Sequence, residues 1–215
     1  MPSAADILRG LTLIASDFVL LAVGWHAALA VALVAIFGER WKPSHRNVAV
    51  ATALPLASVS ALAWAHGNPF NGTTFALLSV GVGIVAVRSA PREPIAQGAR
   101  WAVALGVVTL AYAWAYPHFL ESYPAWTYLI AAPVGLVPCP TLGALLGLGL
   151  VTGGFRSLAW SIVVAIAGLF YALFGMLRLG VWLDAGLLAA SVAMLVAALA
   201  PRLRRGSRRE TAAAW

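Results

Sequence analysis

Long apolar stretches, separated by short polar breaks, fill most of this 215-residue sequence. A helix needs about 20 mainly apolar residues to cross the roughly 30 Å hydrocarbon core of a bilayer. Hydrophobic residues make up 62% of the chain and charged residues 10%, whereas soluble domains carry about 25% charged residues. The sequence therefore predicts an all-α, polytopic transmembrane bundle of about seven spans. These cover residues 18–37, 48–66, 73–88, 101–116, 127–153, 158–177 and 184–200.

The segments on either side of this membrane domain, 18–200, are expected to lie at the membrane surface. Residues 1–17 place Asp6, Arg9 and Asp17 among apolar residues, a pattern that favours an interfacial helix. Residues 201–215 are rich in arginine and are predicted to form a disordered tail held against anionic lipid.

The basic residues predict how the chain is oriented. Under the seven-span prediction, only Arg9 and Arg178 lie opposite the other basic residues. Cytoplasmic loops carry the excess of Lys and Arg, so the N-terminus is expected outside and the C-terminus in the cytoplasm of a bacterial inner membrane. Membrane topology thus explains the net charge of +7, and nucleic acid is not expected as a partner. The expected partner is the lipid bilayer, with a homo-oligomer or a membrane complex left open.

The fifth predicted span, 127–153, is longer than one crossing requires and contains Pro138-Cys139-Pro140. Proline has no N–H and clashes with the carbonyl four residues earlier, and it also biases the preceding residue toward extended backbone. We therefore expect the span to be broken here, with a first half-helix ending near Leu136 and a second beginning at Pro140. The break would free the carbonyl groups of Val134 and Leu136.

Broken helices form ion and substrate sites in transporters. The thiol of Cys139, the only cysteine, would lie at this break. Gly143 and Gly147 follow it at intervals of four residues, a small-residue pattern that packs helices together. Cys139 is thus either a small filler at a packed kink or a binding or reactive group. The candidate ligand-binding residues are Val134, Leu136, Pro138, Cys139, Pro140, Thr141 and His26.

Histidines extend this prediction toward a metal. His26 lies within the first span, where an ionisable residue suggests function, although a neutral imidazole bonded to a backbone carbonyl is the alternative. His66 and His118 lie in predicted outer loops and could simply be solvated. A soft cation suits a thiolate ligand, so the candidate metal ligands are Cys139, His26, His66, His118 and Glu121. No paired-cysteine metal motif supports them.

Two membrane protein classes are disfavoured. The only lysine, Lys42, lies in a loop, which argues against a retinal Schiff base. Acidic residues within the spans occur only near their ends, at Asp17, Glu39 and Asp184. A proton-coupled carrier usually needs a central carboxylate, so that class is weakened.

The segment Gly135-Leu136-Val137-Pro138-Cys139-Pro140-Thr141 resembles the Gly-x-Pro-Cys-Pro-Thr core of a family of uncharacterised bacterial multi-pass membrane proteins. Asn68-Pro69 is also similar to that family, whereas Trp25-His26 stands where a Trp-Pro pair is expected. The resemblance implies a multi-pass membrane architecture and carries no activity with it.

Three functions stay open at this point. The first is a protein that binds or transports a small ligand or soft cation at the broken helix. It is also compatible with a membrane oxidoreductase or transferase that uses Cys139 and His26. The third reading is a non-catalytic scaffold subunit of a membrane complex.

Overall fold

The structure is a computed structural model that describes residues 3–38, 40–120 and 122–213. These residues form helices and connecting segments without a β-strand, apart from one isolated bridge between Ser44 and Pro94. The all-helical prediction is therefore confirmed. The helices are α1 (Ala4–Asp17), α2 (Val19–Phe37), α3 (His45–Ala51), α4 (Ala53–Ala65), α5 (Pro69–Ser89), α6 (Arg100–Trp114), α7 (Tyr128–Ala131), α8 (Pro138–Val151), α9 (Leu158–Arg178) and α10 (Ala185–Ala213).

Five helical segments of the described chain are long and apolar enough to cross a membrane. The first is α2, and the second consists of α3 and α4 taken together (His45–Ala65). The other three are α5, α9 and the segment Trp182–Ala200, which includes the start of α10. These segments indicate a multi-pass membrane protein. In place of two further predicted spans, 101–116 and 127–153, the structure has α6 with 15 residues and α8 with 14. At 1.5 Å per residue, these helices reach only about 22 Å, less than the bilayer core.

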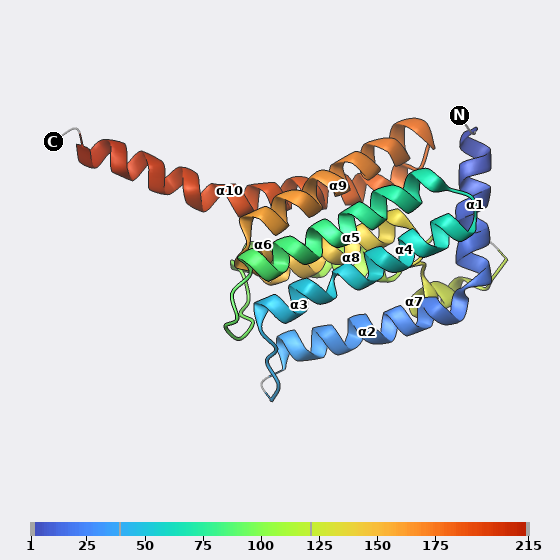
Figure 1. The fold of residues 1–215 in the computed structure, drawn as a ribbon, viewed down its shortest axis with the longest axis horizontal. Helices are drawn as coiled ribbons and strands as arrows, with labels where there is room; N and C mark the ends of the chain where they lie inside the picture. Colours follow the sequence, from blue (N-terminus) through green and yellow to red (C-terminus); the bar gives the residue numbers. More distant parts are fainter. Residues whose placement is uncertain (1–2, 39, 121, 214–215) are drawn as a thin grey trace.

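The longer helices, apart from α1, run between two ends of an elongated bundle (Figure 1). At one end, Arg156 forms an ion pair with Glu93, and the Gly98 N–H donates to the Val151 carbonyl at 2.8 Å. We call this the basic end, because the loops and helix ends that meet there carry Arg40, Lys42, Arg46, Arg88, Arg92, Arg100 and Arg156. At the opposite end, Cys139 meets Asp184. We call that the thiol end.

Helix α8 lies at the centre of the bundle and is covered by protein. From residue 131 to residue 152, every residue is buried except Cys139. The closest neighbour of α8 is α6: a Cβ atom on Gly147 would lie 3.1 Å from the Gly106 carbonyl oxygen, and one on Gly143 would lie 3.2 Å from the Ala113 Cβ. The predicted packing of a helix against Gly143 and Gly147 is therefore confirmed.

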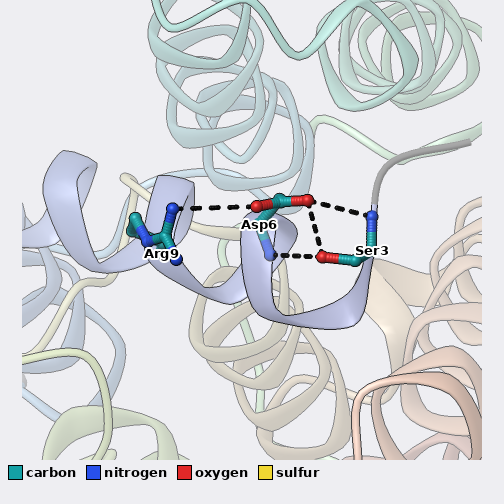
Figure 2. Close-up of polar contacts among 3 residues, drawn as sticks. All are labelled: Ser3, Asp6 and Arg9. Carbon is teal, nitrogen blue, oxygen red and sulfur yellow. Dashed lines mark hydrogen bonds and ion pairs between the residues drawn. The ribbon is translucent and has the colours of Figure 1, made fainter.

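Helix α1 crosses the thiol end of the bundle, roughly at right angles to the other helices (Figure 1). It starts with a capping box in which the Ser3 hydroxyl accepts from the Asp6 N–H at 3.1 Å and the Ser3 N–H donates to the Asp6 carboxylate at 3.2 Å (Figure 2). The Ser3 hydroxyl also donates to this carboxylate, and these bonds lower the pKa of Asp6 below its usual value. Arg9 lies 3.7 Å from the same group. Leu11 and Ile14 face the bundle and are buried.

Helix α10 continues to Ala213 and extends beyond the basic end (Figure 1). Arg, Ala, Leu and Glu dominate the end of this helix, and all four have high helix propensity. Disorder of residues 201–215 stays a prediction. Interaction of this segment and of residues 1–17 with the membrane surface stays a prediction.

Candidate functional site

The chain leaves helical conformation between α7 and α8. Residues 132–137 are not helical, and Gly135 has φ +75°, a left-handed conformation that favours glycine. Helix α8 begins at Pro138, with Val137 as its N-cap. The helix was expected to start at Pro140, two residues later. The first N–H groups of a helix have no acceptor within the helix, so prolines in the first turn cost no hydrogen bond and both fit there. The preceding helix ends at Ala131, not near Leu136.

Hydrogen bonds and packing hold this turn in place. The Thr141 hydroxyl accepts from the Gly135 N–H at 2.8 Å and donates to the Val137 carbonyl at 2.6 Å. The indole of Trp25 occupies the space where a Cβ on Gly135 would stand. The Trp25 Nε1–H donates to the Ser58 hydroxyl at 3.2 Å. Residues of α8, α2 and α4 thus hold the turn in place.

We expect Thr141→Val to lower the free energy of unfolding by about 1–3 kcal/mol, because it leaves the buried Gly135 N–H without an acceptor. Thr141 has no exposed surface, so water cannot replace the hydroxyl. Thermal or denaturant unfolding in detergent would measure the loss. Thr141→Ser keeps the hydroxyl and serves as the matched control. A Thr141→Val variant that is no less stable than Thr141→Ser would show that this bond does not stabilise the turn.

The thiol of Cys139 lies in the first turn of α8 and belongs to a polar cluster. Its Sγ–H donates to Asp184 Oδ2 at 3.2 Å, and the Tyr116 hydroxyl donates to Asp184 Oδ1 at 2.8 Å. The Tyr112 hydroxyl donates to the neighbouring Leu183 carbonyl at 3.1 Å. Asp184 is only 1% exposed, and a buried carboxyl group needs such donors because its desolvation costs several kcal/mol.

The connection between α9 and α10 brings Asp184 to this position. Gly180, with φ +73°, turns the chain back, and the Val181 N–H donates to the Gly175 carbonyl at 2.9 Å. The carboxyl group of Asp184 then occupies the space where a Cβ on Gly175 would lie. A side chain at position 175 would exclude Asp184, so the glycine is required for the contact with Cys139.

A small pocket adjoins the cluster. Its volume is about 20 Å³, and its polar wall consists of Cys139, Asn71 and Tyr171. The Tyr171 hydroxyl donates to Asn71 Oδ1 at 3.0 Å. Ile7 and Leu11 of α1 line the same pocket. It therefore holds about one water molecule while α1 is in this position.

His26 has a structural role in α2. Its Nε2 lies 2.9 Å from the Trp114 carbonyl oxygen, at the end of α6, and its Nδ1 lies 2.9 Å from the Ala22 carbonyl oxygen. Its ring contacts the Trp114 indole edge-on, with 4.7 Å between centroids. A neutral imidazole can donate to one of these two carbonyl groups, as in the alternative interpretation of this residue. Asp184 is the hydrogen-bond partner of Cys139.

The other candidate metal ligands lie in separate contacts. His66 Nδ1 is 2.9 Å from the Leu62 carbonyl oxygen, and the His118 ring packs on Phe119 with 4.2 Å between centroids. Glu121 lies outside the described residues. Within the ranges that the structure describes, no three His, Cys, Asp or Glu side chains are grouped to hold a metal ion. The soft-cation site stays a prediction.

The carbonyl group that accepts two hydrogen bonds within the turn is not one of the two that were predicted to be free. Pro133 accepts hydrogen bonds from the N–H groups of Leu136 at 3.2 Å and Val137 at 3.1 Å. Val134 and Leu136 are both buried. Cation binding by the carbonyl groups of these two residues stays a prediction.

Asp184 is not among the site residues predicted from the sequence. It lies near the end of a predicted span, and it accepts hydrogen bonds from both Cys139 and Tyr116. An isolated Asp between a glycine turn and a long apolar stretch was the available signal, because intramembrane acidic residues pair with partners in the bundle.

Comparison with known proteins gives no relative. No family model, curated protein or solved structure matches this chain. The resemblance to the bacterial family with a Gly-x-Pro-Cys-Pro-Thr core is therefore still an expectation, and the function has to be argued from the residues around Cys139.

Proposed function

We propose that this chain is a seven-span membrane protein that binds a small ligand beside Cys139, in the pocket beneath α1. Helices α6 and α8 would complete the seven spans, since they connect the same two ends as the five longer segments. The fifth span would then be the interrupted one, with α8 as its second half. The clustering of arginines supports a cytoplasmic basic end and a thiol end on the outer side of a bacterial inner membrane.

The observation that carries the proposal is the position of Cys139. It is the only residue between 131 and 152 that is not buried, and its open side forms the pocket wall with Asn71 and Tyr171. Apolar residues, including Phe119 and Phe174, line the remainder. This combination of an apolar wall and a few convergent polar groups is typical of small-molecule sites. It suits a ligand with an apolar body and one hydrogen-bonding group.

Ligand binding requires α1 to move. Small-molecule pockets occupy about 300–1,000 Å³, whereas this one has about 20 Å³. Leu11 is buried against the bundle from α1 and lines the pocket. Displacement of α1 would enlarge the pocket toward the membrane surface at the thiol end, so we expect ligand entry from that side.

Labelling of the single cysteine tests whether α1 covers the pocket. Leu11→Ala should speed the reaction of Cys139 with N-ethylmaleimide in the folded protein, because it removes part of the cover. Leu13→Ala is the matched control: Leu13 lies on the same helix but is 51% exposed, so its rate should equal that of the wild type. Equal rates in all three proteins would contradict a pocket covered by α1.

Mass spectrometry of small molecules that copurify with the protein tests binding itself. A bound compound should be present with the wild type and with Leu13→Ala, and depleted about fivefold by Cys139→Ala, which removes one hydrogen-bonding group. The same content in wild type and Cys139→Ala would overturn the proposal.

The hydrogen bond between Cys139 and Asp184 favours a second function, covalent chemistry at the thiol. Asp184 would accept the thiol proton while Sγ attacks an electrophilic carbon and displaces its leaving group, which is iodide when the electrophile is iodoacetamide. General base catalysis is typically worth about 10²–10⁴-fold. In a Leu11→Ala background, Asp184→Asn should therefore slow alkylation by iodoacetamide about a hundredfold. An unchanged rate would eliminate this role and leave ligand binding alone.

A further inference from the structure

A second hollow lies at the basic end of α2 and is separate from the pocket at Cys139. Its volume is about 330 Å³. Among the described residues that line it, Arg40 is the only charged one, and the others include Ala30, Val31, Val34, Gly38 and Trp41. The hollow is thus an apolar groove with a guanidinium group and an indole at one end.

The end of α2 explains this arrangement. The helix stops at Phe37, where Gly38 adopts an extended conformation and its N–H donates to the Val34 carbonyl at 2.7 Å. The chain then leaves the helix axis and brings Arg40 and Trp41 to the mouth of the groove. From Ala30 to Gly38, the helix provides about 12 Å of apolar wall at 1.5 Å per residue.

The groove faces the surroundings of the bundle. Val31 is 59% exposed and Val34 is 72% exposed, so these aliphatic side chains contact lipid in a membrane-spanning helix. Trp41 is also exposed, and tryptophan is enriched at the level of the lipid head groups. The groove therefore runs from the hydrocarbon region, beside Ala30, to the head-group region, beside Arg40.

Positive charge surrounds the same level. The residues that provide it at the basic end are Lys42, Arg46, Arg88, Arg92 and Arg100, whereas Arg156 is paired with Glu93. Basic pockets beside transmembrane helices bind anionic lipid head groups, and arginine can form two parallel hydrogen bonds with a phosphate. The charge and the apolar wall together match one molecule that has both an acyl chain and a negative head group.

We propose that this groove binds an anionic phospholipid, with one acyl chain along Ala30, Val31 and Val34 and the phosphate at Arg40. This is a lipid site on the outside of the bundle, and it does not depend on the function of Cys139. A helix from a second copy of the chain would satisfy the apolar wall but would leave Arg40 without an anionic partner, so the lipid is the better occupant.

Native mass spectrometry of the purified protein, loaded with phosphatidylglycerol or with phosphatidylcholine of the same acyl chains, tests the site. The wild type should retain phosphatidylglycerol preferentially. Arg40→Gln should reduce its retention about fivefold, the effect expected of one basic residue at a membrane surface. Arg92→Gln is the matched control, since Arg92 is an exposed residue of the same end that does not line the groove.

A second pair of variants tests the apolar part. Ala30→Phe fills the groove and keeps Arg40, so it should also lower phosphatidylglycerol retention, whereas Ala27→Phe, at an exposed position of α2 outside the groove, should not. Equal losses in Arg40→Gln and Arg92→Gln would overturn the proposal in favour of diffuse charge attraction. Unchanged retention in Ala30→Phe would overturn it as well. A lipid-independent dimer that Ala30→Phe dissociates would identify a second copy as the occupant.

Discussion

Gly106→Ala should lower the free energy of unfolding by about 1–3 kcal/mol, the cost of adding a methyl group to a filled core. A Cβ at this position would lie 2.9 Å from both the Gly147 carbonyl oxygen and the Val151 nitrogen. Both are backbone atoms of α8, so neither can rotate away, and α6 and α8 would have to separate. Thermal or denaturant unfolding in detergent, followed by circular dichroism, would measure the change.

Gly81→Ala is the matched control for that experiment. Gly81 also lies within a helix, α5, but a Cβ there would meet nothing within 4 Å. Alanine is favoured over glycine inside a helix by roughly 0.5–1 kcal/mol, so this variant should be as stable as the wild type or slightly more stable. If both variants lost the same stability, the close approach of α6 and α8 would not be what holds the centre of the bundle together.

Asp184→Ala should have the second large effect, a loss of about 2–4 kcal/mol in the free energy of unfolding. It removes the acceptor of both the Tyr116 hydroxyl and the Cys139 thiol, and each buried polar group left unpaired costs about 1–3 kcal/mol. The same unfolding measurements apply.

A double-mutant cycle separates the thiol from the rest of the cluster. Cys139→Ala, Asp184→Ala and the double variant give the coupling energy between the two side chains, and residues in direct contact usually couple by about 0.5–3 kcal/mol. Tyr116→Phe should cost about 1 kcal/mol, because it removes one of the two donors and leaves the carboxyl group in place. Additive losses in the cycle would mean that Cys139 and Asp184 do not interact.

The helical bundle could be predicted because apolar composition and proline act locally. Apolar stretches give the approximate place of each helix, and Pro138 and Pro140 predict an interruption of the helix close to Cys139. The position of the helix start could not be fixed in this way. Both prolines fit within the first turn of α8, so the rule that proline ends a helix placed the boundary two residues too late.

The partner of Cys139 depends on tertiary structure. Asp184 is 45 residues away in sequence, and its position follows from the turn at Gly180 and the space left by Gly175. No spacing rule connects a thiol in one helix to a carboxyl group before another. His26 also depends on tertiary structure. Its residue type suggested a ligand-binding role, but in the fold its ring lies next to a backbone carbonyl group at the end of α6.

The enclosed position of α8 has a consequence for how the protein is made. A ribosome synthesises α8 before α9 and α10, two of the helices that pack around it. During translation, its glycine-rich surface must meet lipid or the insertion machinery until those later segments arrive. The thiol likewise gains its carboxyl partner only once the segment Trp182–Ala200 has been synthesised and inserted, so the site cannot form before that step.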